Sequence, residues 1–282
     1  MLTFRPFEHK HPRRRTAPMV DDNPPDELIR LWRLPTGSRL GRPAGLDVDL
    51  VVRTAVELAD RGGLPGATLP KIAETLGVTP MSLYRHIGSK EELLVLMSDA
   101  ATAPPPDFAT PVDDWRPALR EWASALWSVH RQRPWLAQLP IAGPPRGPGA
   151  IGWMDAGLRA LRPAGLDAGM KVGVVMVVSG YVRQADLLAQ QLEQGRRATG
   201  LDESQTNRAY GRHMARLVDP ERFPDAAQLF ASGLFESAPP PAADPGQDDF
   251  EFGLEIVLDG VAAMIRSGVA HGEAEVAGEG RG

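Results

Sequence analysis

Residues 68–94, TLPKIAETLGVTPMSLYRHIGSKEELL, decide how this chain folds. Two short amphipathic segments flank Gly77, whose missing side chain permits the left-handed backbone of a sharp turn. Thr79 and Pro80 are typical of a helix start, because the hydroxyl can cap the helix and proline fits its first turn. Ser89 to Glu92 fits the S-x-x-E capping box and predicts another start. We therefore predict three successive helices, at 69–76, 80–87 and 90–102.

Two short helices joined by a tight turn form a helix-turn-helix, whose second helix enters the major groove of DNA. At 100° per residue, setting Leu83 inward places Ile87 about 40° away, while Met81 and Arg85 point nearly the opposite way. Ser82 and Tyr84 fall on the flanks. The helix at 80–87 is therefore predicted to have a buried apolar side and an outer side that can contact bases.

The outer side chains suit DNA. Pro80 and Met81 can press on thymine methyl groups, Ser82 can hydrogen-bond to base edges, and Arg85 can reach guanine or a phosphate. Contacts to phosphate are expected from Tyr84, His86 and Lys90. Helix-turn-helix shapes also serve as plain packing units, so a solvated face is the alternative reading of these residues.

The rest of the chain repeats the 3.6-residue apolar period and lacks a convincing strand, which predicts an all-α fold. A helix over Asp26 to Leu34 is possible within an otherwise disordered extension, and Thr68 is expected to cap the helix at 69–76. Further helices are expected at 48–61, 115–132, 149–161, 167–194, 204–217, 225–235 and 248–266. The predicted domains are an N-terminal extension (1–47), a DNA-binding domain (48–102), a helical effector-binding and dimerisation domain (103–272), and a disordered tail (273–282).

Composition excludes several classes of protein. The 282 residues include no cysteine, so disulfides and thiolate metal sites are excluded and a cytoplasmic location is expected. No apolar run reaches the roughly 18 residues of a membrane span. We found no G-x-S-x-G element, phosphate loop or partnered carboxylate pair, so we expect no enzyme activity and no cofactor. His130 and His213 lack partners at metal-ligand spacing, and no metal site is expected.

The same residues resemble the DNA-binding region of the TetR family of transcriptional regulators. The match rests on Ala73-Glu74, Gly77-Val78, Leu83-Tyr84-Arg85-His86 and Lys90, at the family's spacing. MSLYRH, HRQRPW and FEFGLEIVLDG are similar to the branch with a tetracycline-repressor-like C-terminal domain. The resemblance covers residues 48–102 well and extends more weakly to about residue 266.

By that resemblance, the DNA contacts are Thr68, Thr79, Pro80, Met81, Ser82, Tyr84, His86 and Lys90. One departure concerns the start of the helix at 69–76, where the family often has a polar or basic residue. Leu69 and Pro70 hold those positions here, and Lys71 could supply the missing charge or be merely solvated.

Charge is a second departure. The net charge of the chain is −5, and residues 49–100 carry seven Asp and Glu against five Lys and Arg. Affinity for a duplex depends on neutralising phosphates, so positive charge should come from elsewhere. Arg39 and Arg42 could form an arm in the minor groove, with help from HKHPRRR at 9–15. The alternative is that these residues only keep a tail soluble.

The resemblance also implies a homodimer whose four-helix interface uses the helices at 167–194 and 248–266, and a pocket for a small effector. Candidate pocket residues are aromatic, Met or polar, although each could equally be core or surface: Trp122, Leu126, His130, Trp153, Met154, Met176, Tyr181, Arg183 and Gln184. The expected function is a repressor that binds a palindromic double-stranded operator and is released by an unknown effector. The alternative is an effector-independent or architectural DNA-binding regulator.

Overall fold

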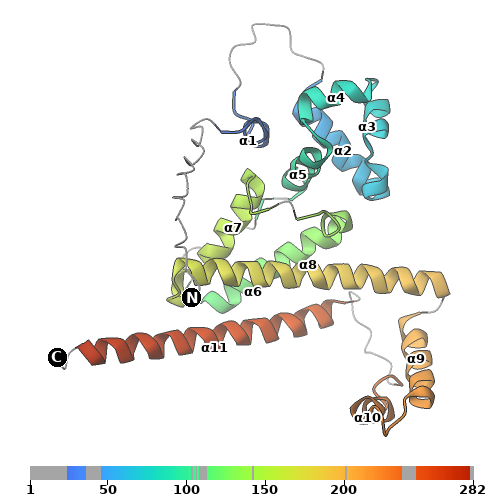
Figure 1. Ribbon diagram of the computed structural model, residues 1–282, viewed down its shortest axis with the longest axis vertical. Helices are drawn as coiled ribbons and strands as arrows, with labels where there is room; N and C mark the ends of the chain where they lie inside the picture. The colour runs from blue at the N-terminus through green and yellow to red at the C-terminus, as the bar shows by residue number, and fades with distance from the viewer. Residues whose placement is uncertain are drawn as a thin grey trace, which may run out of the picture.

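The computed structural model describes residues 24–35, 46–102, 104–105, 107, 113–141, 143–200, 202–236 and 246–279. Within these ranges the chain is helical and contains no strand (Figure 1). The α-helices are α1 (Asp26–Leu31), α2 (Val48–Gly62), α3 (Leu69–Leu76), α4 (Pro80–Ile87), α5 (Lys90–Ala101), α6 (Trp115–Gln132), α7 (Pro148–Ala160), α8 (Ala168–Thr199), α9 (Glu203–Leu217), α10 (Pro224–Ala231) and α11 (Gln247–Glu279). Three short 3₁₀ helices are η1 (Leu64–Gly66), η2 (Pro134–Leu136) and η3 (Arg162–Ala164). The all-α prediction is confirmed.

Helices α2 to α5 form the N-terminal unit. Its core is apolar and almost fully closed to solvent, with members from all four helices: Val51, Ala55, Ile72, Leu83, Ile87, Leu93 and Met97. Gly77 ends α3 with φ +66° and ψ +30°, the left-handed conformation expected from the sequence. The turn it makes sets α4 across α3 and leaves one side of α4 facing outward.

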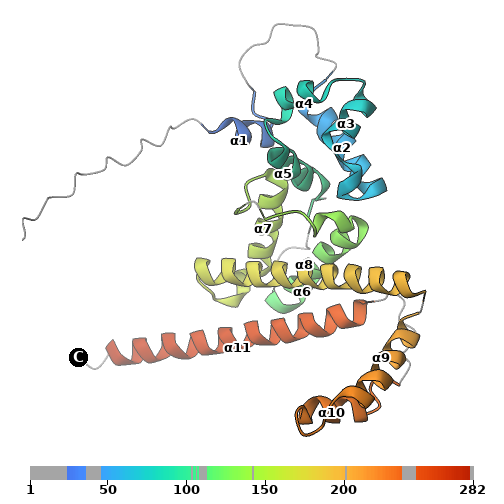
Figure 2. The same cartoon turned by 45° about the vertical axis from the view of Figure 1, so that its right-hand side comes forward.

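Helices α6, α7, α8 and α11 form the second unit, with α8 and α11 running side by side in both views (Figures 1 and 2). Large aromatic side chains join them. The indole of Trp122 donates to the carbonyl oxygen of Trp153 at 3.0 Å, and the Trp127 ring stacks on Phe250 with centroids 4.5 Å apart. These contacts fix α6 against α7 and α11.

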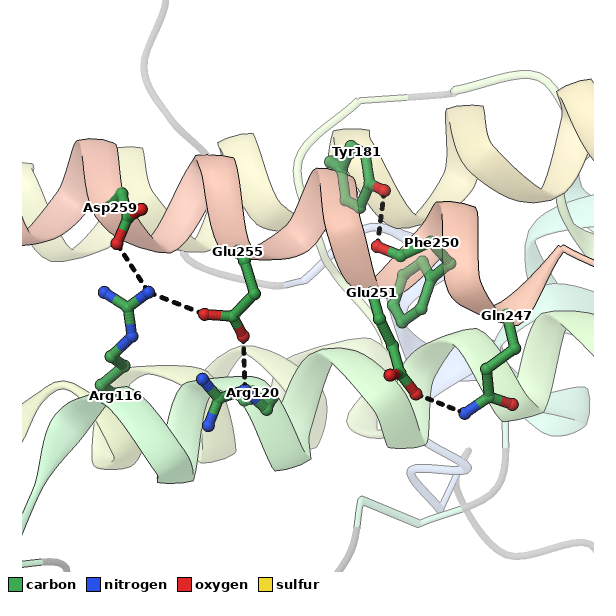
Figure 3. Close-up of polar contacts among 8 residues, drawn as sticks. All are labelled: Arg116, Arg120, Tyr181, Gln247, Phe250, Glu251, Glu255 and Asp259. Atoms are coloured by element: carbon green, nitrogen blue, oxygen red, sulfur yellow. Dashed lines mark hydrogen bonds and ion pairs between the residues drawn. The ribbon is translucent and has the colours of Figure 1, made fainter. Parts of the chain in front are cut away.

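Ion pairs reinforce the contact between α6 and α11 (Figure 3). Arg116 Nη2 lies 2.7 Å from Glu255 Oε2 and 2.7 Å from Asp259 Oδ1, and Arg120 Nε lies 2.6 Å from Glu255 Oε1. Hydrogen bonds from Arg120 and Arg116 lower the pKa of Glu255 to about 2. On the other side of α11, the Tyr181 hydroxyl donates to the Phe250 carbonyl oxygen at 2.7 Å.

Helices α9 and α10 form a hairpin that projects from one end of α8 (Figures 1 and 2). Its small core consists of Tyr210, Phe230 and Phe235, whose ring centroids lie 5.3–5.6 Å apart. Leu217 and Leu234 nevertheless remain mostly exposed. The hairpin is therefore held together largely by its own aromatic contacts.

The structure departs from the expected helix ends in several places: α8 ends at Thr199 rather than 194, and α10 ends at Ala231 rather than 235. Thr68 precedes α3, but its side chain caps no backbone N–H. Ser89 accepts a hydrogen bond from the Glu92 N–H at 3.0 Å, whereas the Glu92 carboxylate turns away to Arg30, so only half of the predicted capping box forms. Helix α11 continues to Glu279, well past residue 266 and into the segment 273–282 that was expected to be a disordered tail.

Helix α8 is apolar on several sides. Over Ala168–Arg197 its length and composition would suffice for a membrane span, although the uninterrupted apolar run is too short for one, and only 28% of its most apolar window is buried. Yet α8 also carries Arg183 and a fully buried Asp186, and it packs on α6 and α11. Burial raises the pKa of Asp186, whose carboxylate accepts a hydrogen bond from Gln190 at 2.6 Å.

Candidate nucleic-acid interface and ligand cavity

Helix α4 has the orientation that the sequence predicts. Thr79 caps it, with Oγ1 accepting from the Ser82 N–H at 3.3 Å. Leu83 and Ile87 are 0% exposed, whereas Met81 is 74% exposed. The predicted buried and outer sides of this helix are thus confirmed as geometry.

The other candidate contacts of α4 and α5 differ in how freely they face solvent. Pro80, Arg85 and Lys90 are exposed, as is Tyr84, while Ser82 and His86 are partly buried. The hydroxyl groups of Ser82 and Thr79 share a hydrogen bond of 2.9 Å. To contact a base, the Ser82 hydroxyl would therefore have to give up its hydrogen bond to Thr79 or form a second hydrogen bond beside it.

Two candidates lie on or next to α3. Thr68 is exposed and its hydroxyl caps nothing, so that hydroxyl can serve a phosphate. Lys71 is exposed as well, but its ammonium donates to the Pro65 carbonyl oxygen at 3.1 Å, which holds it near η1. Arg39 and Arg42 lie outside the described residues, as does the segment 9–15.

A cavity of about 490 Å³ opens between α5, α6, α8 and the segment from Leu136 to Gly147. Its walls are mainly apolar with a few polar groups, the usual make-up of a small-molecule site. Lining side chains that bear on its chemistry are Leu94, Val95, Asp99, His130, Arg146 and Arg183.

His130 is the unusual polar group in this cavity. Burial, with a smaller contribution from the nearby positive charge of Arg183, lowers its pKa to about 4, so the imidazole is neutral at pH 7. Its Nδ1 is buried and has no hydrogen-bond partner among the described residues. Arg183 is itself engaged, since it donates to the carbonyl oxygens of Ala137 and Leu139. A ligand that bonds to His130 would satisfy a polar atom that otherwise costs free energy.

The remaining pocket candidates are not gathered at this cavity. Tyr181 and Gln184 line a second hollow of about 600 Å³ along α8 and α11, where Leu188 and Leu192 are half exposed. Burial raises the pKa of Tyr181. The others line neither hollow: Trp122 and Trp153 belong to the core, Leu126 and Met154 are partly buried, and Met176 is 68% exposed.

Sequence reasoning identified only His130 and Arg183 in the first cavity and missed its other lining residues, among them Asp99 and Arg146. Asp99 Oδ1 accepts from the Ala150 N–H at 2.9 Å, which ties α5 to the first turn of α7. Arg146 lies in a segment rich in Gly and Pro that has no periodicity, so no pattern indicated that it faces a cavity.

Comparison with known proteins identifies the family. Residues 51–97 match the family model for bacterial regulatory proteins of the tetR family, and residues 106–265 match the tetracyclin repressor-like C-terminal domain. The transcriptional repressor DrrR1 of Streptomyces coeruleorubidus is 32% identical over 239 residues, covering 84% of this chain and 85% of that protein. The class C tetracycline repressor of Escherichia coli is 28% identical over 221 residues, covering 78% and 92%.

Solved structures agree. ActR of Streptomyces coelicolor without ligand superposes with a TM-score of 0.63 at 25% identity, covering 79% of this chain and 99% of ActR. ActR in complex with actinorhodin gives 0.64 at 25% identity, covering 78% and 97%. The chain therefore belongs to the TetR family of transcriptional regulators, with a helix-turn-helix DNA-binding domain and a tetracycline-repressor-like C-terminal domain.

Proposed function

We propose that this protein is a cytoplasmic homodimeric repressor that binds a palindromic operator and is released by a small organic effector. The observation that carries the proposal is the outer side of α4, where Met81 and Arg85 are exposed above the buried Leu83. In a two-fold symmetric dimer, the two copies of α4 would enter major grooves about one helical turn, ~34 Å, apart.

The dimer is supported by apolar side chains that one copy leaves uncovered. On α8 and α11 they recur at helical spacing, and they are Val172, Met176, Val177, Leu188, Leu192, Phe252 and Ile256. Exposed apolar side chains that recur along neighbouring helices in this way support an interface. Two such helices from each copy would make a four-helix contact, as the family resemblance implies.

A second copy fits this face better than lipid does. Helix α8 places Lys171, Arg183 and Asp186 within the segment that would have to cross a bilayer. Charged side chains at the centre of a bilayer are costly. The buried side of α8 also packs against α6 and α11. Only the remaining side of α8 is therefore open to a partner, whereas a membrane-spanning helix would need lipid around it.

The effector site we favour is the cavity lined by His130, because it is a mainly apolar space of drug-like size whose wall includes a buried histidine nitrogen without a hydrogen-bond partner among the described residues. The second hollow lies along the apolar face that we assign to the dimer. We infer an effector with an apolar body and one hydrogen-bonding group that meets His130 Nδ1. ActR, a relative of similar fold, was solved with actinorhodin bound.

Selection of operator DNA from a random pool by the purified full-length protein tests the proposal. We expect an inverted repeat, a dimer by light scattering, and release of the DNA by a member of a panel that includes actinorhodin and tetracycline. His130→Phe should keep operator affinity but lose release. Failure to bind any duplex at low salt would refute the regulator, and binding that no compound in a broad screen reverses would favour the effector-independent alternative.

A further inference from the structure

Helix α1 belongs to neither region matched by the family models, which begin at residues 51 and 106. It is nonetheless docked on the body of the protein. Leu31 is only 3% exposed, and α1 lies beside α5 in both views (Figures 1 and 2). A segment expected to be largely disordered thus contributes to the core, so its contacts call for an explanation.

On one side α1 holds the DNA-binding domain. The Arg30 guanidinium pairs with the Glu92 carboxylate through two hydrogen bonds, one of them 2.8 Å from Nη2 to Oε2. This hydrogen bonding to Glu92 raises the pKa of Arg30. Arg33 Nε lies 2.6 Å from Asp49 Oδ1 on α2, which adds a second anchor.

The Arg30–Glu92 pair abuts the end of the helix that faces DNA. Gly88 follows α4 with φ +68°, and its N–H donates to the Tyr84 carbonyl oxygen at 3.0 Å. A Cβ on Gly88 would lie 2.1 Å from Glu92 Oε2 and 2.8 Å from Arg30 Nη2. The pair therefore lies directly against the turn between α4 and α5, where the positive φ of residue 88 favours glycine.

On its other side α1 holds the rim of the ligand cavity. Arg146 Nη2 lies 3.0 Å from Glu27 Oε1, and the Trp32 indole donates to the Arg146 carbonyl oxygen at 2.7 Å. Arg146 lines the cavity. Both its side chain and its backbone are thus bonded to α1, which connects the rim to the end of α4.

We propose that α1 is a positioning element that holds the DNA-binding domain against the cavity rim in the arrangement that fits the operator, with Glu27 and Arg146 as the joining residues. The proposal rests on operator binding as the proposed function. Without this link the DNA-binding domain samples more orientations, and a smaller fraction of the protein has the orientation that fits the operator. The apparent affinity for the operator falls in proportion to that fraction.

Two single variants of the full-length protein, Glu27→Gln and Arg146→Gln, test the link. They change the net charge in opposite directions, so bulk electrostatics predicts opposite effects on DNA affinity. The positioning role predicts that both lower operator affinity, by about threefold to tenfold. The double variant should be no weaker than the weaker single variant, because both remove the same contact.

Asp155→Asn is the matched control, since Asp155 pairs with Arg159 inside α7 and joins no two elements. It should not lower operator affinity. All four variants should keep the wild-type melting temperature within about 2 °C and the wild-type slope of log affinity against log salt, because no phosphate contact is removed. An affinity for Glu27→Gln equal to or above wild type would overturn the proposal.

Hydrogen exchange of the free protein gives a readout that needs no operator. The amides of α1 and of residues 84–92 should exchange faster in Glu27→Gln and Arg146→Gln than in Asp155→Asn. Unchanged protection there would overturn the link even if the wild-type protein binds DNA. Faster exchange in a protein that binds no duplex would instead support the link and refute the proposed function.

Discussion

Replacing Leu83 or Met81 by alanine should separate folding from DNA binding within a single helix. Leu83 is 0% exposed and packs in the core of the DNA-binding domain. Leu→Ala at fully buried sites costs about 3–5 kcal/mol, because apolar contacts are lost and a cavity remains. Met81 is 74% exposed, so its truncation should change stability by no more than about 0.5 kcal/mol.

For operator affinity we expect the opposite pattern, with the direct loss of a DNA contact in Met81→Ala rather than in Leu83→Ala. Loss of one apolar contact to a thymine methyl, about 1 kcal/mol, corresponds to roughly fivefold weaker binding. Met81→Ala should therefore show this loss with an unchanged urea midpoint, measured by fluorescence anisotropy and circular dichroism. Leu83→Ala should lower the midpoint of the N-terminal domain. If Met81→Ala destabilised the protein as much as Leu83→Ala and left affinity intact, the outer side of α4 would not be the DNA-binding side.

Three further outcomes follow from the structure. Ile256→Glu places a charge on the apolar face of α11, so light scattering should show monomers and operator affinity should fall by about tenfold or more. Glu255→Gln removes a carboxylate whose pKa is depressed from 4.5 to about 2, so its stabilising effect exists above pH 4.5 and fades as the pH falls toward 2. Because Glu255 is 40% exposed, denaturation should show a deficit of only about 0.5–1 kcal/mol at pH 7, vanishing near pH 2. Deleting residues 1–23 removes five Lys and Arg and leaves α1, Arg39 and Arg42 in place; it should weaken operator binding and flatten its salt dependence, whereas an unchanged slope would dismiss the contribution of the basic segment 9–15.

The helix-turn-helix could be predicted closely because its signals are local. Gly77 requires a left-handed backbone, and Thr79 with Pro80 starts α4 where the sequence indicated. The inward direction of Leu83 follows from the helical period alone. Each of these features depends on residues fewer than five positions apart, so no tertiary information was needed.

The sequence indicated a possible helix over Asp26 to Leu34, but the docking of α1 (Asp26–Leu31) could not be predicted in the same way. Its partners are distant in sequence, with Glu92 62 positions from Arg30 and Arg146 119 positions from Glu27. Composition indicated disorder, because charged and proline residues surround the short helix. The docking of Leu31 depends on a surface that only the folded domains create.

The ligand cavity shows a related limit. Residue type pointed to aromatic and Met side chains, but Trp122 and Trp153 fill the core and Met176 faces outward. His130 and Arg183 were chosen only as polar groups among candidate liners, and they are the two candidates that line the first cavity. Whether a polar or aromatic side chain of a helix faces solvent, the core or a cavity depends on how the neighbouring helices pack against it.

Helix α5 connects these parts at both of its ends. Near its start, Glu92 closes the turn after α4; near its end, Asp99 holds the N–H of Ala150. The two carboxylates are seven residues apart, about 10 Å along the axis. At the Asp99 end the approach is close, since a Cβ on Gly149 would lie 2.7 Å from the Asp99 carbonyl oxygen.

A short, straight helix gripped this tightly can shift only as a unit. If α7 moves when the cavity fills, the close contact between Gly149 and Asp99 transmits that movement to α5. The Glu92 end then moves against α4, and α1 links the same two points from outside through Arg30 and Arg146. The cavity is thus joined to the end of α4 by two parallel connections, one through α5 and one through α1.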